Sequence, residues 1–403
     1  MEQKIKIQLI KYFLFFIASL IIGLILSISI FRSINSVSSI SNNEILSQHL
    51  WNSYKSLFIT QEGRVIRPLN DNDTVSEGQS YAMLRAVWMG DKEIFDNCYT
   101  WTEYHLKRSK KDIGDTLLAW HWNHGSVIDW MPASDADIDY ALSLILADRR
   151  FIQHEGGKYP DNVMNYKDRA LEILADISIK LIRKSTDGEI FLSPWIETPD
   201  EPLSVNLSYY SPAHFQVFYE FTGNPLWMNL KKQTYQFLNI IASRFNGNTG
   251  SGLFPDWAMF NDKGEFINLP GRESNFGWES VRIPFRLYLD YLWFGEKLVT
   301  ETLSGSLYSF ILSELRRNNR IFSEYNIDGS STNPYESSSF YSAYSLTSRP
   351  FNTELADQLL DRTKSYIVSS DDLIFFEDPK DYYRNSISWI PFAERAGLLR
   401  YKW

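Results

Sequence analysis

Three short segments of the sequence place a carboxylate where a helix is expected to begin. Glu77 follows a Ser/Thr capping signal and precedes an apolar run with helical spacing. Asp135 and Glu279 precede two further runs of this kind. Carboxyl groups act as general acids and bases in catalysis, but an acidic residue in a first turn also caps a helix or is stabilised by its dipole. These three sites are therefore either catalytic or structural.

Aromatic side chains are abundant in the chain. It contains 13 Trp and 23 Tyr among 403 residues, and both residue types carry polar atoms that need partners when they are buried. Flat sugar faces stack on such rings, so a carbohydrate cleft would use them. A core rich in tryptophan is the alternative explanation for part of the set.

Several ordered motifs resemble glycoside hydrolase family 8. Residues 76–81 (SEGQSY), 133–137 (ASDAD) and 278–282 (WESVR) look like its three signatures. The family includes endo-β-1,4-glucanases, licheninases, chitosanases and xylanases. Residues 58–66 (FITQEGRVI) resemble the opening of bacterial endoglucanases encoded alongside cellulose synthase. The resemblance covers roughly residues 48–400.

The resemblance implies roles for the first two acidic segments. Glu77 corresponds to the general acid, which must hold a proton near neutral pH. Burial or a neighbouring carboxylate such as Asp135 raises a carboxyl pKa, whereas a helix N-terminus lowers it, so desolvation has to outweigh the dipole. Asp135 corresponds to the aspartate that holds the distorted sugar at the central subsite. Asp137 is a further candidate for substrate binding, with helix capping or orientation of a neighbour as the alternative.

Glu279 is the main departure from the family pattern, because close members carry aspartate as the general base at this position. Glutamate is also a competent base, but its extra methylene moves the carboxylate by about 1.5 Å. Catalytic geometry tolerates about 0.5 Å, so the backbone or the attacking water must compensate. Arg282 shares the helical face of Glu279 and is expected to keep it ionised. Asp290 is a fallback base, about 16 Å further along the same helix.

Other family-like segments supply expected substrate contacts. Trp120 and Trp122 lie in a segment that resembles a sugar-stacking platform, and Trp257 and Phe340 are candidates of the same kind. Asp256 is expected to shape the floor of the cleft.

The segment 206–212 (NLSYYSP) also resembles part of the family's site. Tyr209 matches a tyrosine near the nucleophilic water. Asn206 and Ser208 are expected to orient the chain beside it.

The overall charge excludes some classes of partner. The formal net charge is −9, which argues against nucleic-acid binding, since that function requires a basic surface. It also argues against a strongly acidic polymer as substrate, unless a local basic patch overrides the average.

No cofactor or metal is expected. The single cysteine, Cys98, excludes an internal disulfide. His121 and His124 are close in sequence but have no third ligand nearby, so polar cleft or surface roles fit them better than metal binding. The sequence contains neither a phosphate-binding glycine loop nor a Gly-x-Ser-x-Gly elbow.

The N-terminus predicts a membrane anchor. An apolar run over residues 12–31 is long enough to span a bilayer, and the Lys residues before it predict a cytoplasmic N-terminus and a translocated body. A cleaved signal peptide is the alternative, although no small-residue cleavage motif follows the run. We therefore expect a tail and anchor over residues 1–32, a polar linker over 33–45 and an extracytoplasmic catalytic domain over 46–403.

Apolar periodicity in this domain is mostly helical. The expected helices cover residues 44–56, 77–90, 92–108, 135–149, 164–183, 211–222, 225–243, 279–295, 299–315, 338–347, 353–363 and 384–398. Short strands are expected near residues 188–192 and 265–269. The periodicity indicates an all-α domain, and the resemblance implies an (α/α)6 barrel, in which helix starts far apart in sequence converge on one cleft.

The leading hypothesis is a membrane-anchored inverting endo-glycosidase that cleaves a cellulose-like β-1,4-glucan. Its partners would be that polysaccharide, the bilayer and, by resemblance to the synthase-associated enzymes, an exopolysaccharide synthesis machinery. Two alternatives stay open. The fold can act on chitosan, xylan, mixed-linkage glucan or another exopolysaccharide, or it can bind polysaccharide as a non-catalytic scaffold.

Overall fold

The computed structural model describes residues 42–111 and 113–403. The chain is mainly helical, as the periodicity predicts. A helix over residues 42–58 is followed by α2 (Ser76–Met89), α3 (Lys92–His105), α4 (Ser134–Ala147), α5 (Tyr166–Lys180), α6 (Pro212–Thr222), α7 (Leu226–Ser243), α8 (Ile283–Phe294), α9 (Lys297–Ser304), α10 (Leu307–Asn318), α11 (Ser338–Ser348), α12 (Thr353–Lys364), α13 (Tyr382–Ile387) and α14 (Ile390–Arg395). Shorter helical turns are η1 (Pro68–Asn70), η2 (Arg108–Lys111), η3 (Asp148–His154), η4 (Leu207–Tyr209) and η5 (Ser280–Arg282).

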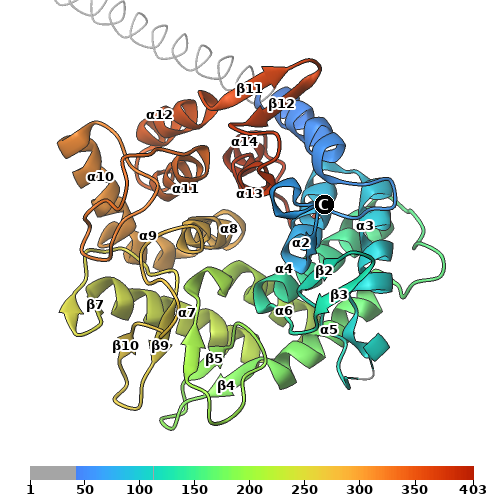
Figure 1. Ribbon diagram of the computed structural model, residues 1–403, viewed down its shortest axis with the longest axis horizontal. Helices are drawn as coiled ribbons and strands as arrows, with labels where there is room; N and C mark the ends of the chain where they lie inside the picture. The colour runs from blue at the N-terminus through green and yellow to red at the C-terminus, as the bar shows by residue number, and fades with distance from the viewer. Residues whose placement is uncertain (1–41, 112) are drawn as a thin grey trace, which may run out of the picture.

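Six of these helices form a closed inner ring (Figure 1). Contacts run from α2 to α4, α6, α8, α11 and α13 in turn, and α13 returns to α2. An outer layer packs on this ring, because α3, α5, α7, α9 and α12 contact α2, α4, α6, α8 and α11 respectively. This arrangement is consistent with the (α/α)6 barrel that the resemblance implies.

Residue composition explains which helices lie inside. Every residue of α4 and α11 is buried, and α11 is rich in serine, whose small side chain lets neighbouring helices approach closely. Outer helices such as α7 and α12 instead alternate buried apolar residues with exposed polar ones, which is the pattern of a helix with one face in water.

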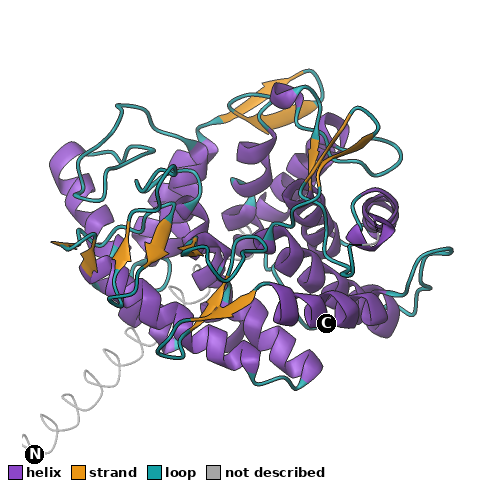
Figure 2. Cartoon of the chain, turned by 60° about the horizontal axis from the view of Figure 1, so that its bottom comes forward, coloured by secondary structure: helices purple, strands orange, loops and turns teal. Residues whose placement is uncertain are grey.

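The strands are short segments in the connections between helices (Figure 2). They are β1 (Thr74–Val75), β2 (His121–Asn123), β3 (Ser126–Asp129), β4 (Ile182–Lys184), β5 (Ile190–Leu192), β6 (Leu203–Val205), β7 (Arg244–Phe245), β8 (Asn248–Thr249), β9 (Ala258–Phe260), β10 (Phe266–Ile267), β11 (Ile367–Ser370) and β12 (Leu373–Phe376). All pairs are antiparallel, in the orders β1-β2-β3, β10-β9-β6, β4-β5, β7-β8 and β11-β12. The first sheet matters for the site, because it joins the segment before α2 to the hairpin that follows Trp120.

The C-terminal region closes the ring against its beginning. Tyr54 in the first helix pairs its hydroxyl with Ser386 Oγ at 3.1 Å. In α2, the Arg85 guanidinium donates to the backbone oxygen of Asn385 at 3.1 Å, and Trp88 Nε1 donates to that of Arg400 at 3.0 Å. Segments about 300 residues apart in sequence therefore form one interface.

Two expected helices are each split in the structure. The expected helix 299–315 is interrupted at Gly305 between α9 and α10, where glycine favours termination. The expected helix 384–398 is divided between α13 and α14, with Pro391 in the first turn of α14. Proline is tolerated there but not within a continuous helix.

The expected anchor over residues 1–32 lies outside the described residues, as does most of the expected linker. The linker was expected to reach residue 45 and the first helix to begin at residue 44, whereas the helix begins at residue 42. Across residues 42–111 and 113–403, no helix combines the length and apolar character needed to cross a membrane.

Candidate active site

Three carboxylates from the starts of inner helices converge on one arginine. Arg282 Nη1 donates to Glu77 Oε2 at 2.5 Å and to Asp135 Oδ2 at 2.9 Å. Arg282 Nη2 donates to Glu279 Oε2. Glu77 and Asp135 are each the second residue of α2 and α4, and Glu279 directly precedes η5. The ring therefore brings together residues that are more than 200 positions apart.

Glu77 is held from both sides. Its Oε1 accepts a hydrogen bond from the Tyr382 hydroxyl, while its Oε2 binds Arg282. The Tyr81 hydroxyl, one turn along α2, lies 3.3 Å from Arg282 Nη1. The start of α2 is fixed by a hydrogen bond from Ser76 N to Trp120 O at 3.0 Å. These contacts fix both the carboxylate and its helix.

Glu279 is carried by a turn that Asp256 organises. Asp256 Oδ1 accepts from Gly277 N at 3.0 Å, from Ser280 N at 2.8 Å and from Ser280 Oγ at 2.6 Å. A Cβ on Gly277 would lie 2.7 Å from Asp256 Oδ2, so the close approach requires glycine. Burial raises the pKa of Asp256 to about 7, against the lowering effect of these bonds. Asp256 thus shapes the site without facing the cleft.

Two polar side chains beside η4 orient the Glu279 carboxylate. Asn206 Nδ2 donates to Glu279 Oε2 at 2.9 Å, and Ser208 Oγ donates to Asn206 Oδ1 at 2.7 Å. Arg282 Nη2 donates to Ser208 Oγ at 2.9 Å. Glu279 is consequently held by an amide and a guanidinium, while its side chain stays 33% exposed.

Asp135 is the most enclosed member of the cluster, with 4% of its side chain exposed. Burial raises its pKa, and the charges of Glu77 and Glu279 add to that effect, while Arg282 opposes it. Its Oδ1 atom is buried and has no hydrogen-bond partner among the described residues. That oxygen is therefore a buried acceptor whose hydrogen-bonding capacity no described residue uses.

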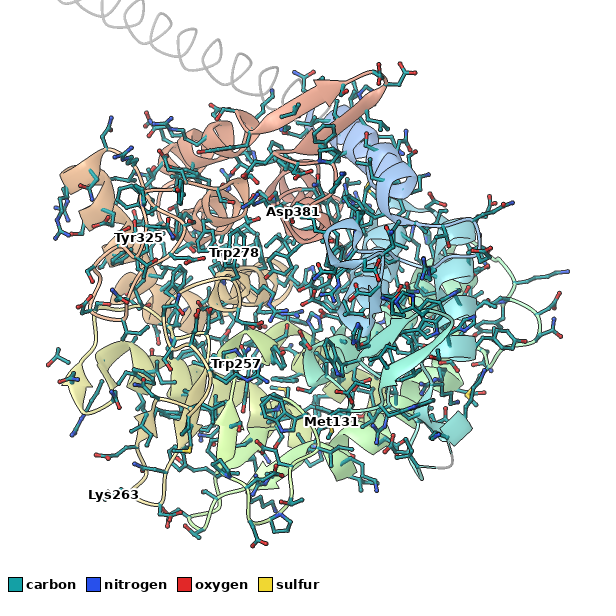
Figure 3. All side chains as sticks on the ribbon, in the orientation of Figure 1. Met131, Trp257, Lys263, Trp278, Tyr325 and Asp381 are labelled. Carbon is teal, nitrogen blue, oxygen red and sulfur yellow. The ribbon has the colours of Figure 1, made fainter. Side chains whose placement is uncertain are left out.

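An open cleft with two lobes runs past these carboxylates. The Trp278 lobe has a volume of about 490 Å³ and is lined by residues that include Glu77, Trp278, Glu279, Asp381, Tyr383 and Arg384. The Trp257 lobe has a volume of about 420 Å³ and is lined by residues that include Trp120, Met131, Trp195, Tyr209, Trp257 and Glu279. Glu279 lines both lobes. In Figure 3, Trp278 and Asp381 lie to one side of the ring centre, and Trp257 and Met131 lie to the other.

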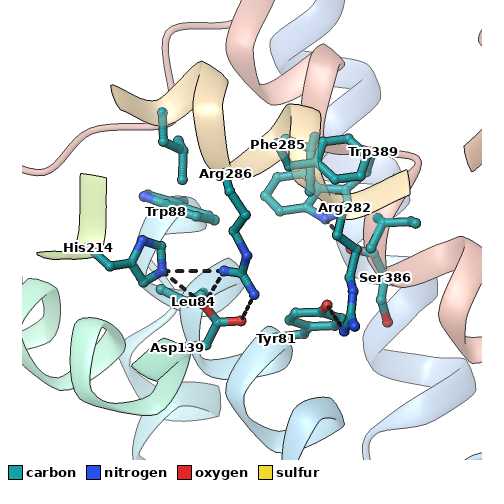
Figure 4. Close-up of a pocket in the computed structure, with 13 residues that line it drawn as sticks. Tyr81, Leu84, Trp88, Asp139, His214, Arg282, Phe285, Arg286, Ser386 and Trp389 are labelled. Carbon is teal, nitrogen blue, oxygen red and sulfur yellow. Dashed lines mark hydrogen bonds and ion pairs between the residues drawn. The ribbon is translucent and has the colours of Figure 1, made fainter. Parts of the chain in front are cut away.

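A small cavity of about 60 Å³ lies next to Arg282 (Figure 4). It is lined by Tyr81 and Arg282 together with a second ionic group, Asp139, His214 and Arg286. Arg286 donates to both oxygens of Asp139, and His214 Nε2 lies 2.8 Å from Asp139 Oδ1. This group is buried and lines neither lobe of the cleft.

Comparison with known proteins identifies the family. Residues 25–373 match the model for glycosyl hydrolases family 8. The chain belongs to this family.

Endoglucanase 2 of Ruminiclostridium josui is a family relative of known sequence. It is 29% identical over 267 residues, which cover 64% of this chain and 52% of that relative. The chain thus spans about half the length of the first curated relatives it matches.

Two solved structures share the fold. The β-1,3-1,4-glucanase of Paenibacillus sp. X4 has a TM-score of 0.73 at 21% identity, covering 89% of this chain and 92% of that one. The endo-β-1,4-glucanase CMCax of Acetobacter xylinum has a TM-score of 0.67 at 20% identity, covering 88% and 98%.

The aromatic residues expected from the family 8 resemblance differ in position. Trp120 and Trp257 line the Trp257 lobe, where Tyr209 packs edge-on against Trp257 at 5.9 Å between ring centroids. Trp122 instead packs against Trp101 at 5.3 Å and lines neither lobe. Phe340 is buried and meets Trp278 edge-on at 5.1 Å, so it supports a cleft residue from below.

Two acidic candidates lie outside the cleft, which corrects the expectations for them. Asp137 is fully buried, and its Oδ1 accepts from Leu118 N at 3.0 Å, so it orients a neighbouring segment and does not reach substrate. Burial raises its pKa to about 8. Asp290 is also buried and binds Lys231 Nζ at 2.8 Å, so it is no alternative base. Both were assigned from sequence spacing, which does not reveal the side of the helix that faces the cleft.

Several cleft residues were missed by sequence reasoning. Tyr382 contacts Glu77, while Trp195 and Arg272 line the Trp257 lobe. Tyr81 was read only as part of an apolar helical run. The adjacent tyrosines at 382 and 383 were a usable signal, since two hydroxyl-bearing rings at a helix start need polar partners.

The two histidines considered for metal binding have separate partners. His121 Nε2 lies 3.0 Å from Asp73 Oδ2, and the exposed His124 lies 3.2 Å from Asp71. No group of three or more His, Cys, Asp or Glu side chains suited to a metal ion occurs in the described parts of the chain.

Proposed function

We propose that the protein is an inverting endo-glycosidase that cleaves β-1,4-linked glucan, with Glu77 as general acid and Glu279 as general base. The observation that carries the proposal is that both carboxylates line one open lobe while the two ends of the Arg282 guanidinium hold them. Family membership supports hydrolysis of a glycosidic bond, and the names of the relatives support β-glucan as substrate.

The geometry fits an acid and a base with different surroundings. Three carboxyl groups share one guanidinium, so excess negative charge favours retention of a proton in the cluster. Glu77 donates that proton to the glycosidic oxygen as the bond to the anomeric carbon breaks. Glu279, the most exposed of the three, removes a proton from the water that attacks the opposite face of the sugar. The product then has the inverted configuration.

Asp135 has a distinct role in this proposal. Its free Oδ1 accepts a hydrogen bond from a sugar hydroxyl at the cleavage point, while Arg282 holds its other oxygen. Hydrogen bonds of this kind strengthen as the sugar distorts toward the transition state. Asp135 thereby positions the sugar between the acid and the base.

The two lobes favour internal cleavage. Glu279 lies where they meet, and each lobe is open to solvent and contains a tryptophan. A polysaccharide can therefore extend past the carboxylates in both directions, as an endo-acting enzyme requires.

The cellular setting rests on the sequence. The apolar run over residues 12–31 supports a membrane anchor with the catalytic domain outside the cytoplasm. We include in the proposal a role beside an exopolysaccharide synthesis machinery.

A polysaccharide panel tests the activity. The full-length protein in mild detergent is incubated with soluble cellulose derivatives, mixed-linkage glucan, xylan and chitosan, and new reducing ends are measured. We expect the fastest release from β-1,4-glucan, with initial products of inverted anomeric configuration by NMR. Cleavage of another polymer would reassign the substrate, and retained configuration would refute the base assignment. Binding without turnover would support a scaffold.

Two variants test the assigned residues. Glu77→Gln and Glu279→Gln should each lower kcat by about 10²- to 10⁴-fold, the usual contribution of general acid–base catalysis. Glu93→Gln, an exposed residue of α3, is the matched control and should retain wild-type rates. Wild-type activity in Glu77→Gln would locate the acid elsewhere.

A further inference from the structure

Arg272 is an exposed arginine that lines the Trp257 lobe. Its guanidinium carbon lies 4.8 Å from the ring centroid of Trp257 and 5.4 Å from that of Trp195. These rings pack against each other at 5.7 Å, and Trp257 is almost completely buried. The guanidinium thus rests on a rigid aromatic surface beside the path of the substrate.

The other arginines of the cleft have acidic partners. Arg282 binds three carboxylates, and Arg384 lies 3.2 Å from Glu377 and 3.3 Å from Asp381. Arg67 lies 2.5 Å from Asp73. Among the residues that the structure describes, Arg272 has no carboxylate within ion-pair distance, and its guanidinium makes no hydrogen bond. Its positive charge is therefore not paired with a described carboxylate, and its side-chain N–H groups make no hydrogen bond to the described residues.

Stacking prepares these donors for a planar anion. A guanidinium that lies on an aromatic face keeps its edge free, and that edge matches the two oxygens of a carboxylate. Hydrogen bonds to an ionised acceptor are about twice as strong as those to a neutral one. A neutral sugar hydroxyl therefore gains less from this site than an acidic group does.

We propose that Arg272 forms a subsite for an acidic substituent, best a carboxylate, on the glucan chain. This inference rests on the proposed glucanase function and refines its substrate class. The protein carries a formal net charge of −9, which repels a uniformly anionic polymer. One free guanidinium suits instead a β-glucan that bears acidic groups at intervals.

The position of the subsite gives it a consequence for cleavage. Arg272 and Glu279 line the same lobe, so a substituent bound by Arg272 lies on a fixed side of the broken bond. The positions of the acidic groups then influence which bonds are cut. In the product fragments, the acidic groups lie near only one of the two types of new chain end, reducing or non-reducing.

The test compares two soluble β-1,4-glucans, carboxymethyl cellulose and neutral hydroxyethyl cellulose, at matched degrees of substitution. The readout is the ratio of kcat/KM for the first polymer to that for the second, with full-length protein. Arg272→Gln should lower this ratio about five-fold, the upper range for an exposed ion pair, and Arg272→Lys should lower it less. Added salt screens the Arg272 attraction, so the difference in this ratio between wild type and Arg272→Gln should shrink.

Arg320→Gln is the matched control, because Arg320 is an exposed arginine over the ring of Phe322 at 4.9 Å, and it lines neither lobe. Its ratio should stay within two-fold of wild type. If Arg272→Gln keeps the wild-type ratio, or slows both polymers equally, the acidic subsite is refuted while the glucanase function stands. If wild type cleaves neither polymer, the function itself fails.

Discussion

Two aspartate–arginine pairs cross the inside of the ring one helical turn apart, and they differ in charge balance. Asp135 pairs with Arg282 at the end of η5, and four residues further along both segments Asp139 pairs with Arg286 in α8. The first arginine also binds Glu77 and Glu279 at the open cleft. The second binds one carboxylate beside the small cavity.

The pKa of the aspartate is shifted in opposite directions in the two pairs: it is raised in Asp135 and lowered in Asp139. Burial by itself acts to raise the pKa of both aspartates. In Asp139 the paired Arg286 and the hydrogen bond to His214 outweigh burial and hold the pKa well below its usual value. In Asp135, burial prevails because its arginine is shared with two other carboxylates. Both aspartates are buried, so the difference lies in the number of carboxylates that share one arginine. Where three share it, a proton is favoured, and where one binds it, a structural ion pair forms.

Breaking the inner pair should have the largest effect. Arg286→Gln leaves the buried Asp139 charge without its main partner, so the free energy of unfolding should fall by about 3–5 kcal/mol. Urea denaturation followed by circular dichroism measures the loss, with Arg320→Gln as an exposed control. A loss below about 1 kcal/mol would show that the pair is not structural.

Breaking the outer pair should affect activity more than stability. Arg282→Gln releases Glu77 and Glu279 from their common support, and misplacement of about 1 Å costs roughly 100-fold in rate. Asp135 can take up a proton to avoid an unpaired charge. The free energy of unfolding should therefore fall less in Arg282→Gln than in Arg286→Gln. Reducing-end assays and urea titrations of both variants decide the point. Equal losses in the free energy of unfolding would contradict the conclusion that the two pairs have different roles.

A third aspartate on α4 sharpens the comparison through pH. Asp137 has a pKa of about 8 in the folded protein, raised by burial, against about 3.9 when unfolded. Between these values the folded chain holds a proton that the unfolded chain releases. Stability should therefore fall as pH rises from about 4 to 8, by up to about 1.4 kcal/mol per pH unit.

Asp137→Asn should remove this part of the slope and keep the acceptor for Leu118 N. Denaturation midpoints measured across this pH range test the prediction, with the exposed Asp262→Asn as control. An unchanged slope in Asp137→Asn would mean that Asp137 is ionised when buried.

The sequence predicted the helices well because apolar periodicity reports local burial. It joined α9 to α10 and α13 to α14, since periodicity continues across a break that Gly305 or Pro391 introduces. The short strand pairs were mostly missed. Strands such as β1 and β8, of two residues each, show no alternation long enough to detect.

Sequence motifs singled out the three carboxylates that cluster in the structure and three residues around Glu279, namely Arg282, Asn206 and Ser208, but not every contact among them. Glu77, Asp135 and Glu279 stood out because motifs at helix starts carry them. The sharing of Arg282 by all three and the contact from Tyr382 follow only from ring closure, which brings α13 against α2. Local sequence patterns do not predict contacts between residues so far apart in the chain.

The contact between Tyr382 and Glu77 also bears on biosynthesis. Helix α2 emerges from the ribosome early, but the tyrosine that holds its carboxylate lies close to the C-terminus. In a nascent chain the Glu77 carboxylate therefore lacks this hydrogen-bond donor until translation is nearly complete. Completion of the candidate site therefore depends on folding of the C-terminal part of the chain, because α13 must reach α2 before the ring closes.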